Sequence, residues 1–308
     1  MDIQVAFSQK SIKLSIKFIF LFIIFNSLVF LNTYAFATKT FPVLFVDKKT
    51  NSLFLTEYRE DKFQVIKTFH TTLGKVQGDK EAEGDLKTPE GIYIFKSKLY
   101  PPQLKPKFGA IAFYMNYPNP YDVLTKHTGS NIMLHATNEP ERLKKDFDSE
   151  GCVVVKNEEI EELQSHIRLG LTPILIFNEL SEEYYHPGKD QRLRSFFEFW
   201  IKNWEEKNIE NYIDYYHSAF TAQGMGKTQW KSYKNSLNVR YNTIRINPKN
   251  VLFYRHPKYS MITFMQNYYS TLRNGKVGFH SQGTKIIYVT EEQGKPKIIA
   301  ENFTSLTW

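Results

Sequence analysis

Cysteine is almost absent from this chain, since its 308 residues include only Cys152. A single cysteine excludes an internal disulfide, and in an exported protein a free thiol is a site of oxidation. Two interpretations of Cys152 stay open, a catalytic nucleophile and a small buried apolar side chain. The Ser149-Glu150-Gly151 segment before it favours the nucleophile, because these residues are typical of a turn rather than of a core strand.

The sequence motifs that are typical of several other functions are also absent. The net charge is +8, but lysine and arginine are scattered among acidic residues without a basic block, which argues against a nucleic-acid partner. The glycine-punctuated loop 74–91 lacks the Gly-Lys-Ser/Thr ending of a phosphate-binding loop, and Ser149 lacks a G-x-S-x-G context. No histidines have the spacing of a zinc site, so we expect neither a metal nor an organic cofactor.

The N-terminus carries the pattern of an export signal. Three lysines precede an apolar stretch over residues 18–31, and Ala35-Phe36-Ala37 follows as a cleavage site. We therefore predict a signal peptide over residues 1–37, with an uncleaved membrane anchor as the alternative, although the apolar stretch is short for a membrane span. Without this segment, which holds three lysines and one aspartate, the net charge is about +6.

The remaining chain divides into two predicted domains, 38–183 and 184–308, separated at the polar stretch 180–189. The first is mostly β, with one helix that begins at Asn157 as its N-cap. The second begins with aromatic residues at helical spacing and continues with alternating strands, which is an α+β pattern. The strands expected in the first domain cover residues 41–46, 52–55, 63–68, 92–95, 131–135 and 172–177. The strands expected in the second cover residues 242–246, 251–255, 259–271, 284–290 and 295–301.

His135 is the candidate base for the thiol. It ends the apolar run 132–134, 17 positions before Cys152, and an imidazole close to a cysteine can accept its proton. The amides of Gly151 and Cys152 lie on a turn and are candidates for an oxyanion hole. A backbone carbonyl or a nearby carboxylate would orient the histidine, and the carboxylates available are Asp146, Asp148 and Glu150.

These residues resemble the L,D-transpeptidase catalytic domain of the YkuD type, over roughly residues 40–178. The resemblance rests on Gly78-Asp79-Lys80, Gly84-Asp85, Lys87 to Tyr93, the strand that ends at His135, and Ser149-x-Gly151-Cys152. It implies a β-sandwich or barrel with one or more helices, Cys152 as nucleophile, His135 as base and Gly151 as the residue whose carbonyl orients the histidine. Two departures leave acceptor choice and carboxylate binding open: Glu150 stands where the family commonly has histidine, and Val154 where it often has arginine.

The second half is similar to an NTF2-like domain, on Trp200, Trp204, residues 208–213 and residues 264–270. Together the two halves resemble murein L,D-carboxypeptidases that determine cell shape. That resemblance implies a periplasmic hydrolase that removes the terminal D-alanine from tetrapeptide stems of peptidoglycan. The candidate substrate-binding residues are Ser149 and Glu150 beside the nucleophile, and Gln266, Tyr268 and His280 in the second domain.

Three alternatives stay open at this stage. The same Cys152 and His135 would serve an L,D-transpeptidase or an amidase that cuts diaminopimelate from a lipoprotein. In a non-catalytic peptidoglycan-binding module, the NTF2-like domain would do the binding and Cys152 would be vestigial. The expected partners are peptidoglycan stem peptides and glycan, and the sequence leaves a homodimer open.

Overall fold

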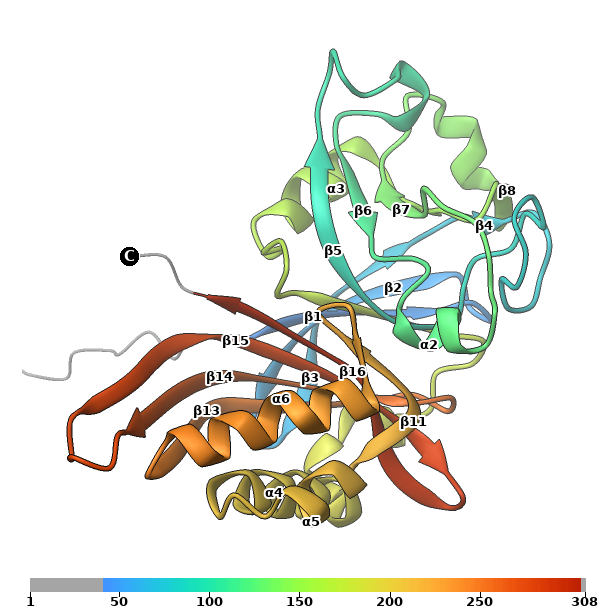
Figure 1. Cartoon of the computed structure of the whole chain (residues 1–308). Helices are drawn as coiled ribbons and strands as arrows, with labels where there is room; N and C mark the ends of the chain where they lie inside the picture. Colours follow the sequence, from blue (N-terminus) through green and yellow to red (C-terminus); the bar gives the residue numbers. More distant parts are fainter. Residues whose placement is uncertain (1–40, 306–308) are drawn as a thin grey trace, which may run out of the picture. The chain divides into compact units, whose positions relative to one another are not determined.

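The computed structural model describes residues 41–305 (Figure 1). The predicted signal peptide over residues 1–37 lies outside these residues. Among the residues described, no helix is both long and apolar enough to cross a bilayer. The fold is mostly β, as the sequence predicts, and the strands form two large sheets that belong to one compact unit.

The first sheet has eight strands in the order β3-β2-β1-β10-β5-β6-β7-β9. All six residues of β1 are buried, because its apolar run lies in the middle of the sheet, antiparallel to β2 and parallel to β10. A short separate ribbon pairs β4 (Leu73–Gly74) with β8 (Phe147–Ser149). The strands of the sheet are β1 (Pro42–Asp47), β2 (Ser52–Arg59), β3 (Lys62–His70), β5 (Gly91–Leu99), β6 (Ala112–Met115), β7 (Met133–His135), β9 (Val153–Val154) and β10 (Pro173–Phe177).

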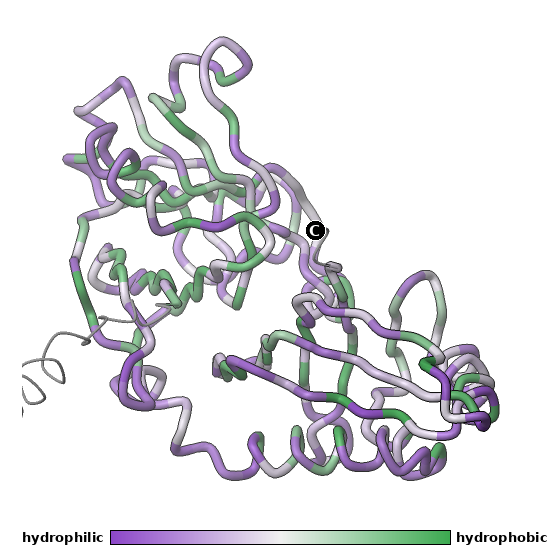
Figure 2. The backbone as a smooth tube through the Cα atoms, turned by 90° about the vertical axis from the view of Figure 1, so that its left-hand side faces the viewer, coloured by the Kyte–Doolittle hydropathy of each residue, from purple (hydrophilic) through white to green (hydrophobic). Residues whose placement is uncertain are grey.

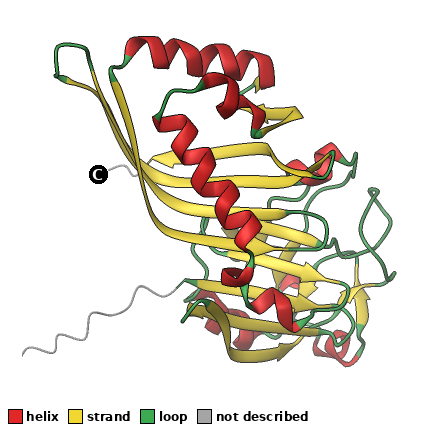
Figure 3. Ribbon diagram, turned by 90° about the horizontal axis from the view of Figure 1, so that it is seen from below, coloured by secondary structure: helices red, strands yellow, loops and turns green. Residues whose placement is uncertain are grey.

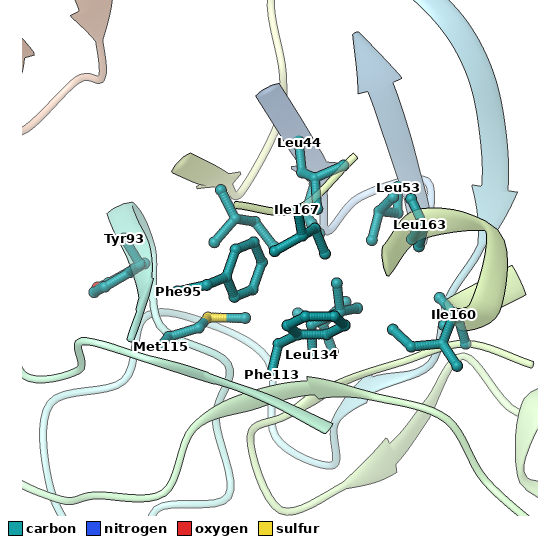
Figure 4. Packing of buried hydrophobic residues seen from close by; sticks show 14 of the residues in the cluster. Leu44, Leu53, Tyr93, Phe95, Phe113, Met115, Leu134, Ile160, Leu163 and Ile167 are labelled. Atoms are coloured by element: carbon teal, nitrogen blue, oxygen red, sulfur yellow. The ribbon is translucent and has the colours of Figure 1, made fainter. Parts of the chain in front are cut away.

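Helix α3 (Asn157–Gln164) covers one face of this sheet. Its buried residues Ile160 and Leu163 point toward Leu134 and the neighbouring strands (Figure 4). The cap differs from the prediction, since Lys156 is the N-cap and its amide donates to Glu159 Oε2 at 2.9 Å. The side chain of Asn157 instead accepts a hydrogen bond from the Ala110 amide at 2.8 Å, so a tertiary contact replaces the local cap.

The second sheet has six strands in the order β12-β11-β16-β15-β14-β13, and helices pack on one of its faces (Figure 3). Two predicted strands are one, β13, which is bent by an irregularity between Lys249 and Leu252. The strands are β11 (Tyr216–Ala222), β12 (Met225–Gly226), β13 (Thr243–Arg255), β14 (Ser260–Thr271), β15 (Val277–Glu292) and β16 (Lys295–Ser305). The helices are α4 (Gln191–Glu205), α5 (Ile209–Asp214) and α6 (Lys227–Arg240).

The two sheets share a hydrophobic cluster. Phe45, Ile92 and Leu175 from the first sheet pack in it with Tyr254 and Met261 from the second. Hydrophobic and hydrophilic stretches alternate along the backbone (Figure 2). Between the sheets the chain forms two short 3₁₀ helices, η3 (Glu182–Tyr185) and η4 (Pro187–Lys189), and the domain boundary placed between 183 and 184 stays a prediction.

Candidate active site

Strands β7 and β9 bring His135 and Cys152 together. They pair in parallel, with Leu134 opposite Val153 and His135 opposite Val154. Side chains alternate across a sheet, so Leu134 and Val153 enter the main core while Met133, His135 and Cys152 share the other side. Both His135 and Cys152 line the same cavity.

A backbone carbonyl orients His135. The ring Nδ1 lies 2.5 Å from Ala136 O, and since a carbonyl only accepts, Nδ1 carries the proton and Nε2 is the free base. Phe108 meets the ring edge-on, with centroids 4.9 Å apart. The carbonyl is therefore that of Ala136 and not that of Gly151, which corrects the role that the family resemblance implied for Gly151.

Two of the three carboxylates near Cys152 in sequence, Asp146 and Asp148, have other partners. Asp148 forms an ion pair with Arg142 at 3.3 Å, and Asp146 lies 3.9 Å from the exposed His70. Arg142 also donates to the carbonyl of Asp148 at 2.9 Å, which ties the segment between His135 and Cys152 to the nucleophile turn. The orientation of the imidazole thus comes from the carbonyl of the residue that follows it, directly after β7.

The turn before Cys152 is held by Ser149. Its hydroxyl donates to Cys152 O at 2.7 Å and accepts from the Gly151 amide at 3.1 Å. Gly151 has a φ of +117°, and a Cβ there would lie 2.7 Å from Lys87 O, so only glycine fits. Because the Gly151 amide already donates its hydrogen bond to the Ser149 hydroxyl, it must turn away from Ser149 before it can stabilise an oxyanion.

The cavity has a volume of about 640 Å³ and walls of mixed charge. Glu150 is exposed and lies on its wall, while Cys152 is 8% exposed at its base. The sequence analysis did not identify Lys107 and Arg142 as residues of the cavity. For Arg142 a signal exists, because it lies in sequence between the two candidate catalytic residues. The charged residues that line the cavity are Lys75, Lys80, Lys107, Arg142, Glu83, Glu139, Asp148 and Glu150.

Both candidate catalytic groups are uncharged near neutral pH. Burial raises the pKa of Cys152 to about 11, with the charge of Glu150 adding to the rise and the Met133 backbone opposing it. Burial lowers the pKa of His135 to about 4, against the hydrogen bond that its ring donates to the Ala136 carbonyl. The resting site therefore holds a thiol and a neutral imidazole, and proton transfer has to accompany attack on a carbonyl.

The second-domain candidates lie away from this cavity. Gln266 and Tyr268 are buried on β14, and Tyr268 packs within the cluster beneath the helices. His280 is exposed on β15, where its Nε2 lies 2.8 Å from Asn267 Oδ1. A role for these three residues in substrate binding stays a prediction. No group of three or more His, Cys, Asp or Glu side chains among residues 41–305 could hold a metal ion.

Comparison with known proteins shows what this architecture is similar to. Residues 42–176 match the L,D-transpeptidase catalytic domain, YkuD, and residues 192–302 match the Cds6 C-terminal NTF2-like domain. No curated protein matches the chain.

Solved structures extend the similarity over both halves. The structure of Bd1075 from Bdellovibrio bacteriovorus is 33% identical, with a TM-score of 0.72, over 86% of this chain and 93% of that one. The helical cell shape determining protein Pgp2 from Campylobacter jejuni is 23% identical, with a TM-score of 0.65, over 86% of this chain and 92% of that one. A lysine-to-alanine variant of Pgp2 is 24% identical, with the same TM-score of 0.65, over 86% of this chain and 91% of that one. At these identities the two Pgp2 structures show the shared fold.

The identity and coverage with Bd1075, together with the two domain matches, decide the assignment. L,D-transpeptidase catalytic domains act on peptidoglycan, so the match over residues 42–176 makes this chain an enzyme of that superfamily. The chain belongs to the family of proteins that join a YkuD-type L,D-transpeptidase catalytic domain to a C-terminal NTF2-like domain.

Proposed function

We propose that this protein is a periplasmic L,D-carboxypeptidase that removes the terminal D-alanine from tetrapeptide stems of peptidoglycan and so influences cell shape. The observation that carries the proposal is that His135, at the end of β7, and Cys152, immediately before the paired strand β9, line one cavity within a domain of the L,D-transpeptidase family. The predicted signal peptide supports export, and the likeness to a helical cell shape determining protein supports the link to shape.

The proposed reaction starts from the uncharged pair. His135 Nε2 takes the thiol proton as Sγ of Cys152 attacks the carbonyl carbon at the L-centre of diaminopimelate. The tetrahedral intermediate collapses, and the imidazolium gives its proton to the nitrogen of the departing D-alanine. Water then adds to the thioester with His135 as base, and the cysteine leaves with the proton, which restores the resting site.

The charges around the cavity suit a stem peptide. Stem peptides carry free carboxylates, and the side chains of Lys75, Lys107 and Arg142 line the cavity. Glu83 and Glu139 on the same walls could bind the free amine of diaminopimelate. A mixed-charge cavity therefore supports a zwitterionic peptide as substrate.

Incubation with purified tetrapeptide muropeptides tests the proposal, with the products identified by mass spectrometry. Release of D-alanine and tripeptide monomers by the wild type, and not by Cys152→Ala with an unchanged circular dichroism spectrum, supports it. Cross-linked dimers would show a transpeptidase instead. Full D-alanine release by Cys152→Ala would remove Cys152 from the mechanism, and sacculus binding without any turnover in the wild type would show a binding module.

A further inference from the structure

A hairpin of the second sheet reaches the loop that forms one wall of the cavity. The loop, residues 75–90, joins β4 to β5 and contributes Lys75, Glu83 and Leu86 to the cavity lining. The turn between β13 and β14 carries Lys258, which forms an ion pair with Asp79 of the loop. Lys258 Nζ also donates to Glu90 O at 3.1 Å. Residues 179 positions apart in sequence thus meet at the base of the cavity wall.

Asp79 closes the base of this loop. One carboxylate oxygen accepts the Glu90 amide at 2.7 Å, and the other pairs with Lys258. Lys48 holds the same region from inside, since its Nζ donates to Thr88 O at 3.0 Å and pairs with Glu90 Oε1 at 2.8 Å. The two ends of the loop are therefore joined through charged side chains, and one of these comes from the C-terminal domain.

The loop in turn contacts the nucleophile turn. The Lys75 amide donates to Ser149 O at 2.9 Å, and Lys87 O lies in the space that a side chain on Gly151 would need. Ser149 and Gly151 are two of the three residues that immediately precede Cys152. A displacement of the loop base is therefore transmitted both to the cavity wall and to the turn that carries the thiol.

The hairpin is anchored independently of Lys258. The buried hydroxyl of Tyr259 accepts from the Ile92 amide and from Asn119 Nδ2, each at 2.5 Å, and donates to Ile92 O at 2.9 Å. His256 Nε2 binds Ile176 O at 3.0 Å. Since these contacts hold the hairpin against the first sheet, removal of the Lys258 charge releases the loop and not the hairpin.

From this chain of contacts we infer that Lys258 is a positioning residue of the catalytic site. Through Asp79 and the carbonyl of Glu90 it fixes loop 75–90 as the wall of the substrate cavity. The NTF2-like domain thereby determines how well the other domain holds its substrate. Only the kinetic part of the test rests on the proposed function.

The test compares Lys258→Met with Arg255→Met. Arg255 lies on the same hairpin and pairs with Asp190 at 3.2 Å, with burial similar to that of the Lys258 pair, and with the more exposed Glu183 at 3.3 Å. Neither carboxylate belongs to the loop. In Lys258→Met, backbone amide hydrogen exchange within peptides of residues 75–90 should rise about tenfold relative to the wild type, because the loop opens locally. KM for the tetrapeptide should rise about fivefold with kcat changed less than twofold, since the loop lines the cavity directly but reaches Cys152 only through the contact of Lys75 with Ser149. Arg255→Met should leave exchange in the loop and KM at wild-type values.

Two further variants separate positioning from general stability. Lys258→Arg, which keeps the charge, should restore slow exchange in the loop. Lys258→Met combined with Asp79→Asn should exchange no faster than the quicker of the two single variants, because both remove one interaction. Equal exchange in Lys258→Met and Arg255→Met, or a uniform rise over the whole chain, overturns the inference. If the wild type releases no D-alanine, the proposed function fails while the exchange measurements still decide this inference.

Discussion

Ionisable side chains are buried both at the cavity of the first sheet and in the core of the second sheet. The free-energy cost of burying them is reduced differently in the two regions. At the cavity, the pKa shifts of Cys152 and His135 both favour the uncharged form. Under the helices of the second sheet, Lys285 and Glu301 instead form an ion pair at 2.6 Å with almost no exposure. Neither oxygen of Glu301 accepts a well-aligned hydrogen bond, so that pair is held by charge.

Lys234 combines features of the uncharged pair and of the buried ion pair. Its Nζ sits 4.0 Å from the ring centre of Trp204 and 4.7 Å from that of Trp230. Burial lowers the pKa of Lys234 to about 7, with Glu301 opposing the shift and Lys285 adding to it. An uncharged pair places no charge in the interior until a proton passes between its members, whereas a buried ion pair stabilises only while both charges are present. The first arrangement suits catalysis and the second suits a fixed structure.

The largest effect should follow from removal of the base in the uncharged pair. We expect His135→Gln to lower kcat for D-alanine release by about 10³-fold or more, because the free Nε2 of His135 is the proposed acceptor of the thiol proton. The thermal unfolding temperature should change little relative to that loss. The matched control is His70→Gln, an exposed histidine of the same domain, which should keep wild-type kcat. A loss below tenfold in His135→Gln would show that the base lies elsewhere.

Breaking the buried ion pair should act on stability. Glu301→Ala leaves Lys285 charged and buried, so we expect the free energy of unfolding in urea to fall by about 3–5 kcal/mol. The control is Glu162→Ala, which breaks the exposed pair with Lys67 and should cost at most about 0.5 kcal/mol. If both variants lose the same small amount, the second sheet does not depend on its buried charges.

Lys234 should make stability rise with pH. Below about pH 7 it is protonated in both states, and above its ordinary pKa of 10.5 it is neutral in both. Between these values the unfolded chain binds the additional proton, so the free energy of unfolding gains up to about 1.4 kcal/mol per pH unit. Urea titrations at pH 7, 8 and 9 should show this rise in the wild type and lose this part of it in Lys234→Met.

The control for that titration is Lys231→Met, on the same helix, where the lysine forms an exposed pair with Glu210. It should keep the wild-type dependence on pH. A difference between the wild type and Lys234→Met that stays constant from pH 7 to 9 would mean that Lys234 does not titrate in this range.

The sequence predicted those features of the fold and the site that depend on the type and spacing of side chains. Short apolar runs predicted the central strands of the first sheet, alternation predicted the strands of the second, and the rarity of cysteine together with its turn selected Cys152. The carbonyl of Ala136 had no such signal, because every residue has one and only the path of the chain decides which carbonyl meets the imidazole. Helix α6 buries Trp230 and Lys234, but its apolar residues do not recur at helical spacing, so its sequence has no amphipathic pattern that would predict the helix. Contacts such as that between Lys258 and Asp79 depend on how the sheets pack, which local pattern does not encode.

The smallest effect should come from Glu150, which stands where the family commonly has histidine. Its negative charge adds to the burial that raises the pKa of Cys152, so Glu150→Gln should lower this pKa. A shift of about half a pH unit gives about three times more thiolate at pH 8, and alkylation by iodoacetamide should speed up by the same factor. Glu83→Gln, on the loop wall of the same cavity, should leave the alkylation rate unchanged. Slower or unaltered alkylation in Glu150→Gln would mean that its carboxylate is too well solvated to act on the thiol, and that the uncharged state of the pair is set by burial alone.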